Sequence, residues 1–299
     1  GLGGYLLVVT QGAALLIADL TGLSYTASVV LAWLSYTGFT MYAGSRGVII
    51  TDTLMFLLFT VATVVFVAFL LEGFGGFQAT IEELTRRDIK RDLTAWHGTI
   101  GEGTAWPTAR DFLVWFVIID IAWSLVYAVS PWQASRHLMA RDEHVVLRAA
   151  IYACLAVIFM QILIYGAGGF INLANPAIDP SETVMLWAAQ NLVPPFLGAL
   201  LLAGIVAAAL SSASTFLSLV GFSVSNDLFS HRNPVRLGAT RLIMGGVSIA
   251  VLGLSLVLPP NVFWIMLFIG TVFASSWGPE GFMSVWSGRI TAAGAYGGM

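Results

Sequence analysis

Charged side chains are scarce in this sequence, since only 10% of its 299 residues are Asp, Glu, Lys or Arg, against about a quarter in an ordinary soluble domain. Cysteine is nearly absent, and the single Cys154 excludes an intrachain disulfide. A basic flank with a cleavage site is also missing from the apolar first residues, which argues against a signal peptide. Hydrophobic residues make up 58% of the chain, so lipid is the expected solvent.

Long apolar runs, bounded by Gly, Pro or charge, predict an all-α polytopic transmembrane bundle. A span needs about 20 apolar residues to cross the hydrocarbon core, and the chain has room for about eight. The predicted spans cover residues 3–19, 24–43, 50–71, 111–130, 147–171, 195–225, 238–258 and 261–287. We expect one transporter domain over residues 1–299, truncated at both ends.

Arginine in the connections alternates with the predicted spans. The turns after the second, fourth, sixth and eighth spans hold Arg46, then Arg136, Arg141 and Arg148, then Arg232, Arg236 and Arg241, then Arg289. Short loops rich in Lys and Arg face the cytoplasm, so these turns are predicted to be cytoplasmic.

A long polar stretch, residues 72–110, is predicted to be an extracytoplasmic loop. Within it, Phe77, Ile81, Leu84 and Ile89 have the spacing of a short amphipathic surface helix. The loop either covers the helix ends as a solvated segment or closes an outer vestibule as a lid.

Asp120 lies near the middle of the fourth predicted span, where a charged residue is costly and is expected to face a bundle interior or a wet cavity. Trp123 and Tyr127 follow at i+3 and i+7 on the same helix face. This face could bind an organic solute. The alternative is a hydrogen-bonded Asp that fixes a helix contact beside packing aromatics.

The sixth span carries a run of hydroxyl side chains, made up of Ser211, Ser212, Ser214, Thr215 and Ser218. Gly204, Ala208 and Ser212 recur every four residues, a spacing that lets helix backbones approach closely. Close packing would explain the run, but hydroxyl and carbonyl oxygens also suit a sodium ion. Asp52, at the start of the third span, either lines an ion exit or caps a helix.

Four stretches resemble the sodium:solute symporter family. They are YTGFTMYAGSRGVIITD from Tyr36 to Asp52, SPWQASRHLMARDE from Ser130 to Glu143, the Ala-Ala-x-Ser-Ser run that ends in Asp227, and WSGRITAAGAYGGM near the end of the chain. Ala43 replaces a glycine of the family pattern, and Ser135 precedes Arg136.

The resemblance implies a leucine-transporter-like fold of five-plus-five inverted repeats, with this chain supplying core helices three to ten. It implies that sodium is bound by the Ala208 carbonyl and by the Ser211 and Ser212 hydroxyls, and that Asp52 lines the cation pathway. Asp120, Trp123 and Tyr127 become candidate walls of the substrate pocket. The remaining sodium ligands would lie on core helix one, which this sequence does not contain.

The function expected from these observations is sodium-coupled symport of a small organic solute by alternating access, in a bacterial inner membrane. The alternative is a transporter-like sensor module of a signalling protein. We expect no enzyme activity and no cofactor besides sodium as the coupling ion. The predicted partners are the solute, sodium and lipid, without nucleic acid.

Overall fold

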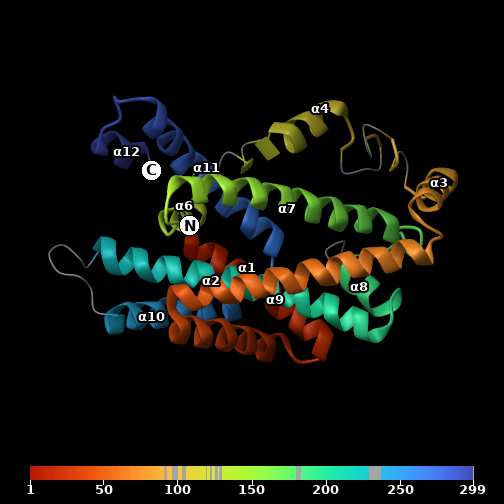
Figure 1. The fold of residues 1–299 in the computed structure, drawn as a ribbon, viewed down its shortest axis with the longest axis horizontal. Helices are drawn as coiled ribbons and strands as arrows, with labels where there is room; N and C mark the ends of the chain where they lie inside the picture. Colours follow the sequence, from red (N-terminus) through yellow and green to blue (C-terminus); the bar gives the residue numbers. More distant parts are fainter. Residues whose placement is uncertain are drawn as a thin grey trace. The chain divides into compact units, whose positions relative to one another are not determined.

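The computed structural model describes residues 1–90, 93–95, 100–102, 106–118, 120–121, 123–124, 127, 130–179, 183–228 and 237–298, without the side chains of 43–46 and 227–228. Helices dominate this part of the chain (Figure 1). The α-helices are α1 (Leu2–Thr21), α2 (Tyr25–Gly73), α3 (Phe77–Arg87), α4 (Ala109–Asp111), α6 (Pro131–Leu138), α7 (Glu143–Ile171), α8 (Val184–Asn191), α9 (Pro195–Ser223), α10 (Leu237–Val257), α11 (Val262–Trp286) and α12 (Ala292–Gly298). There are also two π-helices, η1 (Phe112–Ile118) and η3 (Val224–Leu228), and residues 120–121, 123–124 and 127 are helical as well.

Five predicted spans match observed helices closely. These helices are α1, α7, α9, α10 and α11, and each is long and apolar enough to cross a membrane. A continuous apolar run in lipid can satisfy its backbone only within a helix, which is why the sequence locates these elements well. The protein is an integral membrane protein.

The predicted count of eight spans is not confirmed. The structure continues the helical backbone through the expected turn between residues 43 and 50, so the second and third predicted spans lie in the single 49-residue α2. A straight helix of this length would extend about 74 Å, more than twice the hydrocarbon thickness. Six helical segments of the described chain qualify as spans, and the one in α2 begins at Gly47.

The fourth predicted span lies only partly within the described residues. Its described beginning is η1, a π-helix over Phe112–Ile118, entered through a capping box in which Thr108 and Asp111 bond each other's backbone. The amphipathic helix predicted in the long polar stretch is confirmed as α3, which buries Thr80 and Leu84.

The contacts of the chain define two compact units. The first consists of Gly1–Met55, Ile121–Ala140 and Val206–Met299, and the second of Phe56–Asp120 and Arg141–Ile205. The prediction of one transporter domain over the whole chain stays a prediction.

The core of the first unit forms around α1, which packs against α10 and α11. One cluster of buried residues joins Leu6 and Leu7 of α1 to Tyr36, Leu217 and Met244. Fully buried Tyr36 also lies 3.2 Å, through its hydroxyl, from the Thr10 hydroxyl. The Thr10 and Tyr36 hydroxyls are therefore paired across two helices inside this apolar core.

An aromatic cluster adjoins this core. Tyr5 of α1 stacks on Phe216 of α9 and Phe273 of α11, with ring centroids 5.4 and 5.7 Å away. Trp132 of α6 meets Tyr5 edge-on at 5.3 Å. Ring pairs at these separations are favourable, so the cluster ties the short α6 to three long helices.

Candidate cation site

A carboxylate, a guanidinium and two hydroxyls meet in the first unit. Asp52 comes from α2, Arg136 from α6, and Ser211 and Thr215 from α9. Ser211 and Thr215 are four residues apart on a helix and therefore share a face. Three separate helices thus bring their polar side chains to one point.

Each carboxylate oxygen of Asp52 accepts at least one hydrogen bond. The Ser211 hydroxyl donates to Oδ1 at 2.7 Å. The Arg136 Nη2 donates to Oδ2 at 2.7 Å, and the Thr215 hydroxyl donates to the same oxygen at 3.2 Å. Arg136 Nη2 also donates to the Thr215 Oγ1 at 2.9 Å, so the four side chains form a closed network.

The network is partly shielded from solvent, since the Asp52 side chain keeps 20% of its surface exposed and the Arg136 side chain 31%. An ion pair in such surroundings is screened less than a surface pair. Removing one partner would leave an unpaired charge in these surroundings, which is costly.

The interpretation of Asp52 as a helix cap is wrong. Asp52 lies well inside α2, more than twenty residues from either end, and its carboxylate bonds to side chains of other helices. The role of Asp52 on a cation pathway stays a prediction.

The three predicted sodium ligands lie together on α9 but point in two directions. The Ser211 hydroxyl bonds Asp52, whereas the Ser212 hydroxyl donates to the Ala208 carbonyl, one turn back on the same helix, at 3.1 Å. A hydroxyl that donates its hydrogen keeps lone pairs for a cation. The donor set of Ala208, Ser211, Ser212, Thr215 and Asp52 is therefore all oxygen, which suits a hard cation.

Sequence reasoning missed Arg136 and Thr215 as members of this site. The sequence presents Arg136 as a loop charge and as part of a family-like motif, and Thr215 as one hydroxyl of the serine run, but neither as a member of this site. A signal did exist, because a carboxylate at a membrane boundary calls for a cationic partner, and Arg136 was predicted on the same side.

Two of the three predicted pocket-wall residues lie close to each other. The Trp123 and Tyr127 rings have centroids 6.2 Å apart, and Tyr127 meets Trp132 edge-on at 5.6 Å. Trp123 also rests against Gly270 of α11, where an added Cβ would lie 2.1 Å from its ring. Asp120 is an exposed residue of the second unit.

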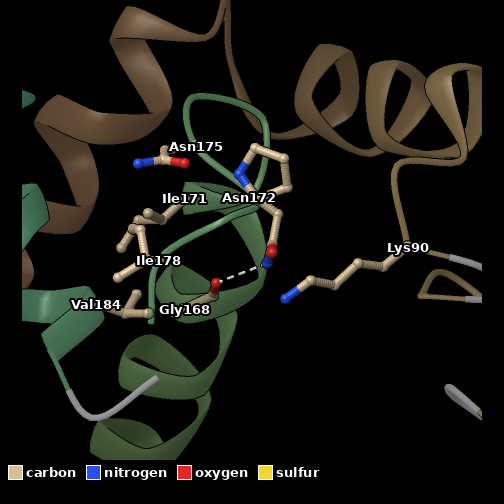
Figure 2. A pocket seen from close by; sticks show the side chains of 8 residues that line it. Lys90, Gly168, Ile171, Asn172, Asn175, Ile178 and Val184 are labelled. Atoms are coloured by element: carbon tan, nitrogen blue, oxygen red, sulfur yellow. Dashed lines mark hydrogen bonds between the residues drawn. The ribbon is translucent and has the colours of Figure 1, made fainter. Parts of the chain in front are cut away.

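A small cavity in the second unit lies between the end of α7 and α8. Figure 2 shows Asn172 bonded to the Gly168 carbonyl, with the Lys90 side chain extending toward it. This cavity, with a volume of about 30 Å³, has room for a water molecule but not for an organic solute. A cavity of about 300 Å³ lies at α11 and α12 beside Glu280 and Arg289. Neither cavity is lined by Asp120, Trp123 or Tyr127.

Comparison with known proteins identifies the family. A family model described as the sodium:solute symporter family matches residues 3–299. This chain belongs to that family. The family is one of transporters, and the resemblance seen in the four motifs is confirmed.

Relatives of this sodium:solute symporter chain include characterised bacterial proteins. It is 24% identical to the sodium/proline symporter of Salmonella typhimurium, over 93% of this chain and 55% of the relative. It is also 24% identical to the sodium/pantothenate symporter of Escherichia coli, over 88% of this chain and 54% of the relative. The chain therefore spans about half the length of the curated relatives it matches.

A solved structure shares the fold. It is the substrate-bound outward-open state of a Na⁺-coupled sialic acid symporter, with a TM-score of 0.77 and 17% identity, over 98% of this chain and 62% of that one. At this identity the likeness establishes the fold alone, and it supports the inverted-repeat helical architecture expected from the sequence.

Proposed function

We propose that this chain forms part of a transporter that couples inward sodium movement to uptake of a small organic solute by alternating access. The observation that carries the proposal is the pair of hydroxyls, Ser211 and Thr215, that α9 presents to the Asp52 carboxylate. Ala208 and Ser212 lie near Ser211 in the sequence of the same helix. Family membership supports it, as do the names of the relatives, which are all sodium symporters. Those names also favour transport over a sensor module.

The residues proposed to hold sodium are Ala208, Ser211 and Ser212, with Asp52 on the route by which the ion leaves. Neutral hydroxyl and carbonyl oxygens compensate the lost water of a monovalent ion without binding it too tightly to release, as in channels. The carboxylate of Asp52 supplies a formal negative charge that attracts the ion. The Ser211 hydroxyl contacts Asp52 directly, so an ion bound at Ser211 would lie next to the Asp52 carboxylate on its way out.

Sodium acts in such a transporter by favouring one of two arrangements of the helices. If sodium raises solute affinity by some factor, solute must raise sodium affinity by the same factor. Trp123 and Tyr127 are proposed as walls of the solute pocket, and the identity of the solute stays open. The bacterial relatives favour the inner membrane as its location, with the arginine-bearing loops in the cytoplasm.

Replacement of the two serines tests this proposal. Ser211→Ala and Ser212→Ala each remove one hydroxyl, and we expect the sodium concentration for half-maximal uptake to rise about tenfold or more, which corresponds to about 1.4 kcal/mol per ligand. The assay is sodium-dependent uptake by the full-length protein in vesicles. Ser284→Ala, at an exposed position of α11, is the matched control because, among the described residues, the Ser284 hydroxyl bonds only the backbone of its own helix. Unchanged sodium activation in both α9 variants would refute the proposed ligands.

A further inference from the structure

Helix α6 is attached to the rest of the first unit at two points, one turn apart. Trp132 packs edge-on against Tyr5, Phe216 and Phe273, with centroids 5.3 to 5.7 Å away. Arg136, four residues later on the same face, bonds Asp52 and Thr215. The first attachment is apolar and indifferent to ions, whereas the second is electrostatic and open to competition.

The guanidinium of Arg136 occupies oxygens that a cation would use. Its Nη2 lies 2.7 Å from Asp52 Oδ2 and 2.9 Å from Thr215 Oγ1, which are distances of direct contact. An ion held by these oxygens and a guanidinium at the same oxygens exclude each other, both by volume and by charge repulsion. Arg136 therefore stands where a second positive charge cannot be accommodated.

We propose that Arg136 is a tethered cation that competes with sodium for Asp52 and Thr215, so that sodium arrival releases the Arg136 end of α6. This rests on the proposed function. It assigns to Arg136 a role in coupling that is distinct from ligand binding, because Arg136 carries only donors and never contacts the sodium ion.

Release of Arg136 can affect the solute pocket through Trp132, the other contact of α6. Trp132, the other anchor of α6, meets the ring of Tyr127, which is a candidate wall of the solute pocket. A shift of α6 therefore moves Trp132 against Tyr127 and links ion occupancy to the shape of that wall. When sodium leaves, Arg136 returns to Asp52 and the original arrangement is restored.

Sodium binding to the purified full-length protein tests the competition. In Arg136→Gln the competitor is gone, and the dissociation constant for radioactive sodium is expected to fall about fivefold or more, the lower end of typical coupling between sites. Arg136→Lys keeps the competing charge, so its dissociation constant for sodium stays closer to that of the parent protein. Arg141→Gln is the matched control, because Arg141 is 91% exposed and pairs only with adjacent Asp142 among the described residues, so its loss leaves the constant unchanged.

Cysteine reactivity provides a second measurement that does not depend on Arg136 variants folding well. In a Cys154→Ser background, Ala134→Cys places a thiol on an exposed position of α6. Sodium is expected to change its alkylation rate when Arg136 is present and to leave that rate unchanged in Asp52→Asn.

The outcomes separate this inference from the proposed function. Weaker or unchanged sodium binding in Arg136→Gln, or alkylation of Ala134→Cys that ignores sodium, overturns the tethered-cation role even if the serine variants behave as proposed. Loss of the serine effect with a preserved Arg136 effect would instead displace the sodium ligands and leave Arg136 as the competitor for Asp52.

Discussion

At the scale of single residues, neighbours in sequence have different roles because a helix turns about 100° between them. Ser211 faces Asp52, whereas Ser212 bonds back to Ala208 on its own helix. Composition alone marked both as equal candidates. The packing of α9 against its partners fixes the rotation of this helix. Only that rotation determines that Ser211 bonds the Asp52 carboxylate and that Ser212 bonds a backbone carbonyl.

Gly198 illustrates a residue chosen for space rather than for chemistry. A Cβ there would lie 2.0 Å from the Ala189 carbonyl oxygen of α8, and a backbone atom cannot move aside easily. We expect Gly198→Ala to destabilise the protein by about 1–3 kcal/mol through overpacking. The unfolding temperature of the detergent-solubilised protein measures this loss of stability.

The control for this substitution is Gly169→Ala in α7, where nothing lies within 4 Å of the added Cβ. That variant should be neutral or slightly more stable, because alanine favours helix over glycine. Equal unfolding temperatures for the two variants would show that α8 does not approach α9 as closely as described.

At the scale of elements, the sequence located helices better than it located their ends. The apolar runs of α1, α7, α10 and α11 were predicted to within a few residues, because lipid leaves a helix as the way to satisfy their backbones. The expected turn near Gly44, Arg46 and Gly47 was wrong, because the backbone stays helical there and α2 is continuous. Glycine lowers helix preference by only about 1 kcal/mol, and arginine is a good helix former, so these residues do not by themselves end a helix.

The candidate site shows the same limit for side chains. The sequence identified Asp52 and the serine run separately, on patterns that each element carries alone. It could not join them to Arg136, which is 84 residues from Asp52, because no periodicity relates side chains on different helices. Such a pairing follows only from the way in which the helices pack.

Helix α3 carries a pH-dependent element of stability. The Arg86 and Arg87 side chains donate hydrogen bonds to the Glu83 carboxylate and lower its pKa from an ordinary 4.5 to about 2. Because the folded pKa lies below the unfolded value, this contribution is present above pH 4.5 and is lost as pH falls from about 4.5 to about 2.

Titration of the Glu83 carboxyl carbon by NMR checks this prediction. The midpoint should lie near 2 in the parent and move toward 4.5 when Arg86→Gln and Arg87→Gln are combined, since both hydrogen-bond donors are then neutral or gone. A midpoint that ignores the double substitution would mean that neither arginine holds the carboxylate in solution.

At the scale of the whole molecule, the small number of charges determines how the chain lies in the membrane. The arginines of the short connections are expected on the cytoplasmic side, and the stretch that contains α3 on the opposite side. Exposed positions near each side are Gln78 of α3 and His144 at the start of α7, so a thiol at either would be accessible to a reagent in the adjoining compartment.

Labelling of single cysteines in cells distinguishes the two orientations. In full-length protein with Cys154→Ser, a membrane-impermeant maleimide should react with Gln78→Cys in intact cells, but with His144→Cys only after permeabilisation. Both substitutions leave the arginines in place, so the topology itself is not disturbed. The reverse pattern would place Arg136 and Asp52 toward the outside, and the sodium release route proposed here would then open to the wrong compartment.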